Sequence, residues 1–428
     1  MSPAAFTGAM GAPAADGATS AGARARDDAP LSVALLTYST KPRGGVVHTV
    51  ELAEALHDLG VEVCIYALNK DQGGFYRAPR CPHVLVPAAP APAGIDAVVE
   101  QRIAELTTGL RRLGGRHDVW HAQDCISANA LAALRAEGRI PHFLRTVHHL
   151  DDYDSPYLRA CQERSVREAD ACLAVSEAWR RVLRADLGVD AAIVPNGVSL
   201  RRYGPAPDGH EAALRARLGA TGSPLYVTVG GVEPRKNSIG LLRAFLEVRR
   251  RLPGAQLVIA GGETLFDYAP YQREFEALAR ENGVWPAPAG ASPAAASPAS
   301  ASPPPLVLAG VLPDALIPAL YRLADAFVFP SVREGFGLVL LEAMASGAPV
   351  VSSAQPPFTE FLEDGESALL VDPSRTDDLA RAMEAILDAG VRRRLRAAAL
   401  ETAARFTWER SARIAADVYR GFLGNRRS

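Results

Sequence analysis

The sequence predicts an α/β protein with two Rossmann-like parallel-sheet domains that face each other across a cleft. Short apolar runs that end at turn-forming residues alternate with stretches of helical periodicity, which is the pattern of βαβ units. The alternation closes at residues 195–198 (PNGV) and restarts at Leu225. With 428 residues, the chain is long enough for two domains of ordinary size, each with its own core.

The first half of the chain predicts an N-terminal domain at residues 31–198. Its first strand (LSVALLTY) is a short apolar run, and the helix after it has apolar residues spaced by threes and fours. The predicted strands are residues 31–38, 61–67, 118–121, 142–147, 171–175 and 191–194, and the predicted helices are residues 46–59, 124–136, 156–169 and 176–187.

A glycine pair stands where the first strand turns into the first helix. Gly44 and Gly45 at a helix start can cradle a phosphate, although many such turns carry glycine only for their geometry. The pair departs from the GxGxxG fingerprint, and no acidic residue ends the second strand. Both departures argue against a dinucleotide such as NAD.

The second half predicts a C-terminal Rossmann-like domain at residues 199–406, followed by a last helix at residues 407–423 with an apolar stripe. The predicted strands are residues 225–230, 256–260, 306–309, 326–329, 349–351 and 368–371, and the predicted helices are residues 238–251, 313–323, 377–387 and 391–405, with a short one after residue 337. Residues 285–305 form a Pro-Ala-Ser tract that predicts a disordered insertion, and residues 1–30 predict a disordered leader.

Composition excludes several classes of protein. The formal net charge of −2 gives no global field for nucleic acid, and no apolar run approaches the length of a membrane span. The five cysteines follow no metal-ligand spacing and suit reduced thiols, which predicts a cytoplasmic protein. Two predicted helices of the first domain carry six arginines, which would form a basic face able to contact anionic lipid weakly. The alternative is that this face is an ordinary solvated surface. The arginines are Arg159, Arg164, Arg167, Arg180, Arg181 and Arg184.

The densest chemistry lies in residues 325–351, a predicted strand–loop–helix–strand unit. Glu334 ends the loop, and Glu342 follows it inside the short helix. Both carboxylates are expected near the carboxyl ends of the strands, where open α/β sheets bind ligands. Two carboxylates repel a phosphate but accept hydrogen bonds from sugar hydroxyls. The combination of such carboxylates with a glycine-rich helix start predicts a sugar-nucleotide site.

Two cations follow the first strand of the second domain. Arg235 and Lys236 stand between that strand and the next helix, so both can point into the cleft and stabilise a departing diphosphate without a metal. A rival metal motif is present at Asp152 and Asp154, but it follows a strand of the other half, and we interpret it as an acidic acceptor-side loop. The sequence therefore predicts no metal and no cofactor.

These segments resemble the family 4 (group 1) retaining glycosyltransferases of GT-B fold, over about residues 31–423. The motifs on which this resemblance rests are EGFGLVLLEAMASGAPVV at residues 334–351, the RK pair at residues 235–236, PNGV at residues 195–198 and TVH at residues 146–148. The resemblance implies that Glu334 holds the donor hexose and Glu342 the ribose hydroxyls. It further implies that the last helix crosses back onto the first domain.

The resemblance also assigns a first-domain histidine to the donor sugar. His148 fits that register better than His149, and its role would be to orient and polarise the sugar near the anomeric carbon. The diphosphate would meet Arg235 and Lys236 from one side and the Gly44-Gly45 loop from the other. The remaining residues expected at the donor are Gly261, Gly262, Leu312, Gly335, Phe336, Gly337 and Leu338, with Glu360 supporting the diphosphate loop.

Two features bear on finer identity. Residues 121–124 (HAQD) depart from the family's commoner H-x-H-D pattern, with Gln123 in place of a histidine, which puts the acceptor in doubt more than the chemistry. The opening of the chain resembles a bacterial subfamily encoded beside nitrilase-type genes, and that likeness adds no acceptor.

The sequence therefore predicts a metal-independent retaining glycosyltransferase. It would move a hexose from a nucleotide-diphosphate sugar to a small-molecule, glycan or lipid-linked acceptor, whose proton passes to the departing phosphate. Two alternatives stay open on the same architecture: a nucleotide-sugar epimerase or sugar phosphorylase, and a non-catalytic nucleotide-sugar-binding protein.

Overall fold

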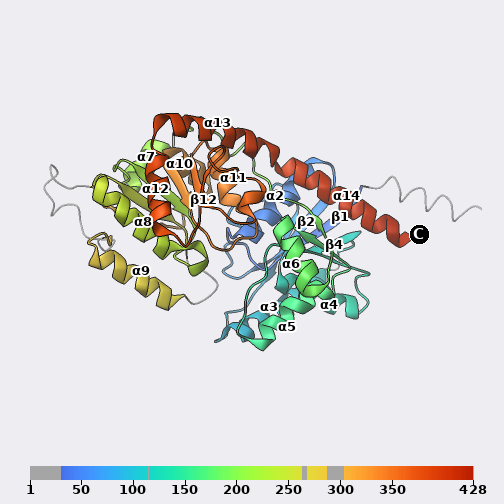
Figure 1. The fold of residues 1–428 in the computed structure, drawn as a ribbon. Helices are drawn as coiled ribbons and strands as arrows, with labels where there is room; N and C mark the ends of the chain where they lie inside the picture. The colour runs from blue at the N-terminus through green and yellow to red at the C-terminus, as the bar shows by residue number, and fades with distance from the viewer. Residues whose placement is uncertain (1–29, 114, 263–267, 287–302, 428) are drawn as a thin grey trace, which may run out of the picture.

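The computed structural model describes residues 30–113, 115–262, 268–286 and 303–427, and it places two α/β domains beside each other (Figure 1). Residues 1–29 of the predicted leader and residues 287–302 of the predicted insertion lie outside the described residues. At the ends of that insertion, Trp285 packs on the core of the second domain, and the carbonyl of Pro305 accepts the N–H of Leu257. The described ends of the tract thus contact the second domain.

The first sheet has seven parallel strands in the spatial order β3-β2-β1-β4-β5-β6-β7. Its strands are β1 (Ser32–Thr37), β2 (Glu62–Asn69), β3 (His83–Pro87), β4 (Val119–Ala122), β5 (Leu144–Val147), β6 (Ala171–Ala174) and β7 (Ala191–Ile193). Its helices are α2 (Gly44–Asp58), α3 (Ile95–Leu113), α4 (Cys125–Ala136), α5 (Pro156–Arg167) and α6 (Glu177–Leu187).

The second sheet has six parallel strands in the order β10-β9-β8-β11-β12-β13. Its strands are β8 (Leu225–Val229), β9 (Gln256–Ala260), β10 (Leu306–Gly310), β11 (Ala326–Phe329), β12 (Val350–Ser353) and β13 (Leu369–Val371). Its helices are α7 (Glu211–Leu218), α8 (Ser238–Arg251), α9 (Ala269–Glu281), α10 (Ile317–Leu323), α11 (Leu338–Ala345), α12 (Thr376–Ala385) and α13 (Ala389–Arg405). The described loops contain the 3-10 turns η1 (Pro234–Lys236), η3 (Asp314–Leu316) and η4 (Phe358–Glu360).

Both sheets reverse their strand order at a central pair. In the first sheet β1 lies between β2 and β4, and in the second β8 lies between β9 and β11. At such a point the connections leave to opposite faces of the sheet, so a crevice opens beyond the carboxyl ends of the strands. The inner strands are largely buried on both faces, as a helix-covered parallel sheet requires, whereas the edge strands β3, β7, β10 and β13 are partly exposed. The predicted pair of Rossmann-like domains is confirmed.

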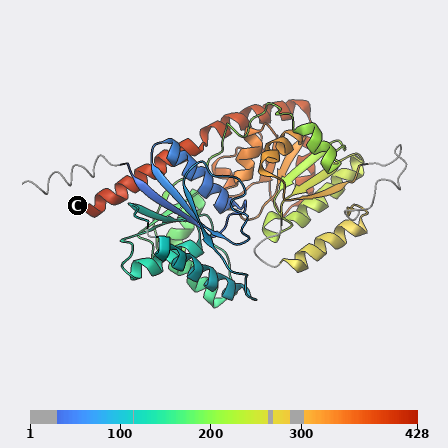
Figure 2. The ribbon, with the colours of Figure 1, turned by 180° about the vertical axis from the view of Figure 1, so that it is seen from behind.

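The last helix, α14 (Trp408–Arg427), leaves the second domain and packs on the first, as both views show (Figures 1 and 2). Trp408 and Tyr419 are buried in the core that the first sheet shares with α2. The Tyr419 hydroxyl lies 2.7 Å from Nδ1 of His121, and the Ser411 hydroxyl donates to the carbonyl of Pro195. The predicted return of the chain to the first domain is therefore confirmed.

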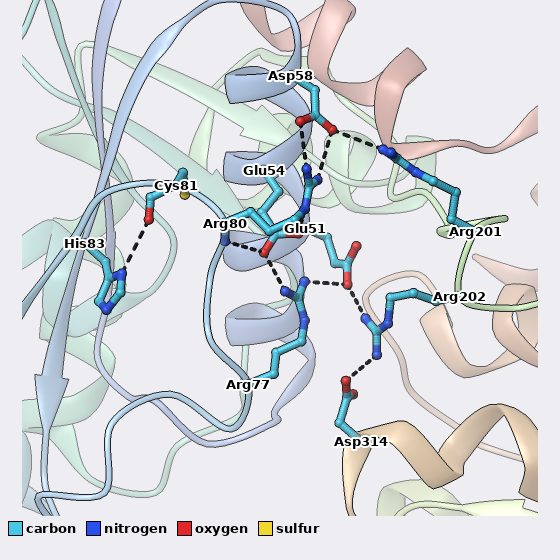
Figure 3. Close-up of polar contacts among 10 residues, drawn as sticks. All are labelled: Glu51, Glu54, Asp58, Arg77, Arg80, Cys81, His83, Arg201, Arg202 and Asp314. Atoms are coloured by element: carbon cyan, nitrogen blue, oxygen red, sulfur yellow. Dashed lines mark hydrogen bonds and ion pairs between the residues drawn. The ribbon is translucent and has the colours of Figure 1, made fainter. Parts of the chain in front are cut away.

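Ion pairs fasten the junction between the domains (Figure 3). Helix α2 presents Glu51, Glu54 and Asp58 on one face, and the guanidinium of Arg202, in the linker after the first domain, bridges Glu51 to Asp314 at the start of η3. The other members of the network are Arg77, Arg80 and Arg201, which pair with the same three acidic residues of α2. Arg202 thus links helix α2 of the first domain to the turn η3 of the second domain.

Four elements were not predicted from the sequence: β3, α3, α7 and α9. Strand β3 is an edge strand of which only Val86 is buried, and it ends at Pro87, so its apolar signal is weak. Helix α9 carries Pro270 in its first turn and buries only Phe275 and Ala279. None of the helices in the described part of the chain has the length and apolar composition that a bilayer span needs.

Candidate active site

A cleft of about 470 Å³ lies between the two domains. Its walls come from the loops that follow strand ends in both sheets, which is where the reversed strand order opens a crevice. From the first domain the cleft is lined among others by Tyr38, Arg43, Gly44, Gly45, Gln123, Asp124, Arg145, His148, His149 and Asp151; from the second by Gly230, Glu233, Arg235, Lys236, Gly261, Gly262, Glu334, Gly335, Phe336, Gly337 and Leu338.

One carboxylate holds two cations at the second-domain wall. Oε1 of Glu334 accepts hydrogen bonds from Arg235 at 2.9 Å, from the ammonium of Lys236, and from the Ser331 hydroxyl at 3.0 Å. Although burial acts in the opposite direction, the charges of Lys236 and Arg235 lower the pKa of the Glu334 carboxyl. Glu334 is thus ionised and fixes both cations at the cleft.

The cations are positioned by a single turn of backbone. Arg235 and Lys236 lie in η1, directly after β8, and the turn ends at Asn237 in the left-handed conformation. Arg235 also pairs with Glu233 at 2.8 Å, and the Lys236 ammonium lies 4.4 Å from the centre of the Phe329 ring. Two consecutive residues therefore present separate positive charges to one wall.

The glycine-rich loop lies against the first domain. A Cβ on Gly335 would stand 2.2 Å from the carbonyl oxygen of His148, so only glycine fits there. The carbonyl of Glu334 accepts from the Trp179 indole at 2.9 Å, and that of Gly335 from the Ser176 hydroxyl at 3.1 Å. We expected this loop to approach a ligand; the structure shows that it also approaches the backbone of the opposite domain.

Helix α11 starts at the cleft, and Glu342, the second predicted glutamate, lies further along this helix and outside the cleft lining. Gly337 precedes the helix without a side-chain cap, and Leu338 is its first residue; both line the cleft. Glu342 does not line it: its Oε2 accepts from the Tyr321 hydroxyl at 2.8 Å, and burial raises the pKa of its carboxyl to about 7. Leu312 is buried in the core and is also not among the lining residues.

His148 faces the cleft from the end of β5. Its Nε2 is buried and has no hydrogen-bond partner among the described residues, and its ring meets that of His48 edge to face at 4.6 Å. Burial, with the neighbouring charges of His48 and Arg145, holds the pKa of His148 well below its usual value. Its imidazole is neutral, which leaves a ring nitrogen able to make one directed hydrogen bond. His149 has a side chain that is 44% exposed and lies 3.4 Å from Asp151.

Three polar side chains of the first-domain wall were not predicted as site residues. Gln123 is 1% exposed, yet both atoms of its amide have no hydrogen-bond partner among the described residues. Nε of the buried Arg145 likewise has no partner among the described residues, and Tyr38 directly follows β1 at the same wall. The sequence carried a signal for two of them, because Arg145 lies inside a predicted strand and Gln123 stands just after the end of another.

The remaining acidic motifs have other contacts. Asp152 pairs with Arg333 of the second domain, and the Glu360 carboxylate accepts the N–H groups of Glu177 and Ala178 at the start of α6. Both contacts join the two domains, so Glu360 caps a first-domain helix. Across the described ranges, no three His, Cys, Asp or Glu side chains gather as a metal site would require.

Comparison with protein families gives two matches. Residues 42–202 match the model described as Glycosyltransferase Family 4, and residues 223–389 match the one described as Glycosyl transferases group 1. A D-inositol 3-phosphate glycosyltransferase of Rhodococcus erythropolis is 30% identical over 91% of each chain, and one of Nocardia farcinica is 31% identical over 73% of this chain and 68% of its own. A GDP-mannose-dependent alpha-(1-6)-phosphatidylinositol monomannoside mannosyltransferase of Mycolicibacterium smegmatis is 30% identical over 65% and 70%.

Solved structures share the fold. Sucrose-phosphate synthase from Thermosynechococcus elongatus superposes with a TM-score of 0.73 at 22% identity, covering 92% of this chain and 100% of its own. HepE of Anabaena, solved in complex with UDP and glucose, gives a TM-score of 0.70 at 18% identity, covering 91% and 99%. Both likenesses extend over the two domains together.

Proposed function

This chain belongs to the family 4, group 1 glycosyltransferases, and we propose that it moves a hexose from a nucleotide-diphosphate sugar to an acceptor with retention of configuration and without a metal ion. The named relatives are glycosyltransferases, one of them is GDP-mannose-dependent, and HepE was solved with UDP and glucose, which supports a nucleotide-sugar donor. Retention, metal independence and the residue roles below are the proposal.

The observation that carries the proposal is the contact of Glu334 with Arg235 and Lys236 at the cleft. As the bond between the sugar and the diphosphate breaks, negative charge grows on the leaving oxygens. Two fixed cations stabilise that charge, and the uncapped start of α11 adds backbone N–H groups beside them. Glu334, once released by either cation, can accept from hydroxyls of the hexose.

The proton needs no base from the protein. The acceptor oxygen bonds to the anomeric carbon on the face from which the diphosphate leaves, and a diphosphate oxygen takes the acceptor's proton. Neutral His148 orients the sugar through Nε2, and Gly44 and Gly45 bring backbone to the donor phosphates from the opposite wall. Glu342 would hold the ribose hydroxyls after a turn of its side chain away from Tyr321.

For the acceptor we propose a phosphorylated polyol. The named relatives act on inositol phosphate or phosphatidylinositol mannoside, and the first-domain wall of this cleft offers Arg43 and Arg145 for a phosphate. The unpartnered amide of Gln123 can both donate to and accept from a hydroxyl. This wall thus has the groups that such an acceptor requires.

The test is a panel of UDP-, GDP- and ADP-hexoses, each with inositol phosphate, followed by proton NMR of the product. An anomeric coupling equal to that of the donor supports the proposal, and an inverted coupling contradicts it. A free epimerised sugar, or transfer that depends on inorganic phosphate, would identify one of the alternative enzymes. Donor binding without any turnover would identify a non-catalytic binding protein.

Three finer predictions from the sequence remain predictions. They are the kinship with the subfamily encoded beside nitrilase-type genes, the cytoplasmic location, and the domain boundaries at residues 198 and 406. Weak contact of the first domain with a membrane has the same standing.

A further inference from the structure

A second cavity, of about 530 Å³, lies in the C-terminal domain at the opposite edge of its sheet from the cleft. Its lining includes Ala324 and Pro349, which stand just before the amino ends of β11 and β12, whereas the cleft borders the carboxyl ends. The volume falls in the range of small-molecule sites in proteins. Nothing in the proposed glycosyl transfer uses this cavity.

Four arginines and no acidic residue stand among its described lining residues. Two of the guanidinium groups are engaged: Arg322 pairs with Asp208 and Glu211, and Arg392 pairs with Asp325 at 3.0 Å.

The other two, Arg393 and Arg396, make no hydrogen bond or ion pair with the part of the chain that the structure describes. Asp388 lies close enough to Arg393 to feel its charge, but its carboxylate is occupied by the N–H groups of Gly390 and Val391. The cavity therefore has unsatisfied positive charge.

The floor of the cavity is the carboxyl end of α11. Ser346 is 1% exposed, and its hydroxyl has no partner among the described residues. Gly347 has a positive φ of 76°, and a Cβ there would lie 2.9 Å from Nε of Arg396. The missing side chain thus leaves room for the Arg396 guanidinium to lie over the floor, beside the free hydroxyl.

We propose that this cavity binds a small phosphorylated molecule, with Arg393, Arg396 and Ser346 on the phosphate. Guanidinium groups match phosphate oxygens in pairs, and a hydroxyl adds a third donor. The alanine, proline and leucine side chains of the lining would contact the body of the molecule. Because α11 runs from the cleft at Gly337 to the cavity at Ser346, an occupant would sit eight helical residues from the donor loop.

The test is calorimetric titration of the full chain with inorganic phosphate and with glucose 6-phosphate, in wild type and in R393Q/R396Q. We expect saturable binding to wild type and at least ten-fold weaker binding to the double variant. The cleft is the same in both proteins, so the difference reports the cavity alone. R394Q is the matched control, since Arg394 is on the same helix, is exposed and does not line the cavity; it should bind as wild type does.

Each result decides the matter. Equal binding by R393Q/R396Q and wild type, or no saturable binding of either probe to wild type, overturns the proposal. If glucose 6-phosphate binds more tightly than inorganic phosphate, the result supports an organic phosphate as the occupant. If inorganic phosphate binds as tightly as glucose 6-phosphate, the apolar lining does not contact the ligand and the proposal of an organic occupant is overturned. S346A keeps the arginines and should weaken binding several-fold. Transfer by R393Q/R396Q without probe should equal that of wild type, which separates this site from the proposed function.

Discussion

The cleft of this glycosyltransferase sets a carboxylate between two cations. Glu334 neutralises part of the charge of Arg235 and Lys236 and fixes their positions, because its carboxylate contacts both cations. Glu334 itself accepts from the Ser331 hydroxyl, Arg235 also pairs with Glu233, and the Lys236 ammonium lies over the Phe329 ring. Burial alone acts to lower the pKa of Lys236, and the adjacent Glu334 charge opposes that effect. The ion pair of Lys236 with Glu334 therefore stabilises the charged form of Lys236 in a partly buried position, where an ammonium without a partner would be unfavourable.

Replacement of Glu334 by Gln tests this arrangement. The amide keeps the shape but loses the charge, so transfer should fall by roughly 10²-fold or more, in the range seen when a charge-stabilising group is removed. The two uncompensated cations should lower the free energy of unfolding by roughly 1–3 kcal/mol. Initial rates and urea unfolding measure the two effects. R243Q, an exposed arginine on α8, should change neither; an active E334Q enzyme would contradict the role assigned to Glu334.

Glu342 should make the protein lose stability as pH rises. Burial lifts its pKa from 4.5 to about 7, so between these values the folded chain holds a proton that the unfolded chain has released. Stability from this group is full below about pH 4.5 and is lost as pH rises through 7. Relative to wild type, E342Q should gain roughly 1–3 kcal/mol in unfolding free energy between about pH 5 and pH 8. A difference that does not change with pH would contradict the shift.

The second-domain half of the site was predictable because it consists of two short segments, the Arg235-Lys236 pair and the glycine-rich loop at Glu334, whose residue types stand out in the sequence. Arg235, Lys236 and the loop at Glu334 follow two strands, and any parallel sheet brings those strand ends to one edge. Gln123 and Arg145 were not predictable as a pair, since their proximity depends on β4 and β5 being neighbours. The Glu342 carboxylate is turned toward Tyr321 and away from the cleft, and no sequence motif predicted this contact.

At the level of elements, every described strand except β3 was predicted, because most of these strands are short apolar runs, including the partly exposed edge strands β7, β10 and β13. The edge strand β3 and the helices α7 and α9 were missed because each buries only one or two side chains, whereas α3 buries five and was missed although its sequence is amphipathic. The return of α14 to the first domain came from the family resemblance. The apolar stripe of α14 predicted only that this face of the helix packs against another part of the protein, and not which domain it packs against.

The turn that sends the chain back into α14 depends on a glycine. A Cβ on Gly197 would lie 2.3 Å from the backbone nitrogen of Trp408 and 2.4 Å from the carbonyl carbon of Thr407, both of which are backbone atoms. G197A should therefore lower the unfolding free energy by roughly 1–3 kcal/mol or more, measured by urea unfolding. G204A is the matched control, since nothing lies within 4 Å of its new methyl group. Equal stability of the two variants would contradict the close packing.

Considered as a whole, the molecule is two sheets whose relative position determines the cleft. The junction uses polar contacts: Arg202 bridges Glu51 to Asp314, Arg333 reaches Asp152, and Glu360 caps α6. Because the cleft walls come from both domains, any loosening of these contacts should change substrate binding before it changes chemistry.

Arg202 and Arg201 give a direct comparison at this junction. Arg202 has a side chain that is 26% exposed and joins two domains, whereas that of Arg201 is 81% exposed and, among the described residues, forms an ion pair with Asp58 alone. R202Q should raise the KM for the donor about three- to ten-fold with a smaller change in kcat, because the walls are less well held. R201Q should behave as wild type, since exposed ion pairs contribute little. The same KM in both variants would show that the bridge does not position the domains.

In the proposed mechanism, fixed cations of the protein, and no metal ion, stabilise the departing diphosphate. The direct measurement is the initial rate of transfer in excess EDTA, for wild type and for K236A. We predict that wild type keeps its full rate in EDTA, while K236A, with its fold intact by circular dichroism, loses roughly 10²-fold or more. Loss of wild-type transfer in EDTA with recovery on added Mg²⁺ or Mn²⁺ would show that a metal ion stabilises the diphosphate, and full activity of K236A would show that Lys236 does not.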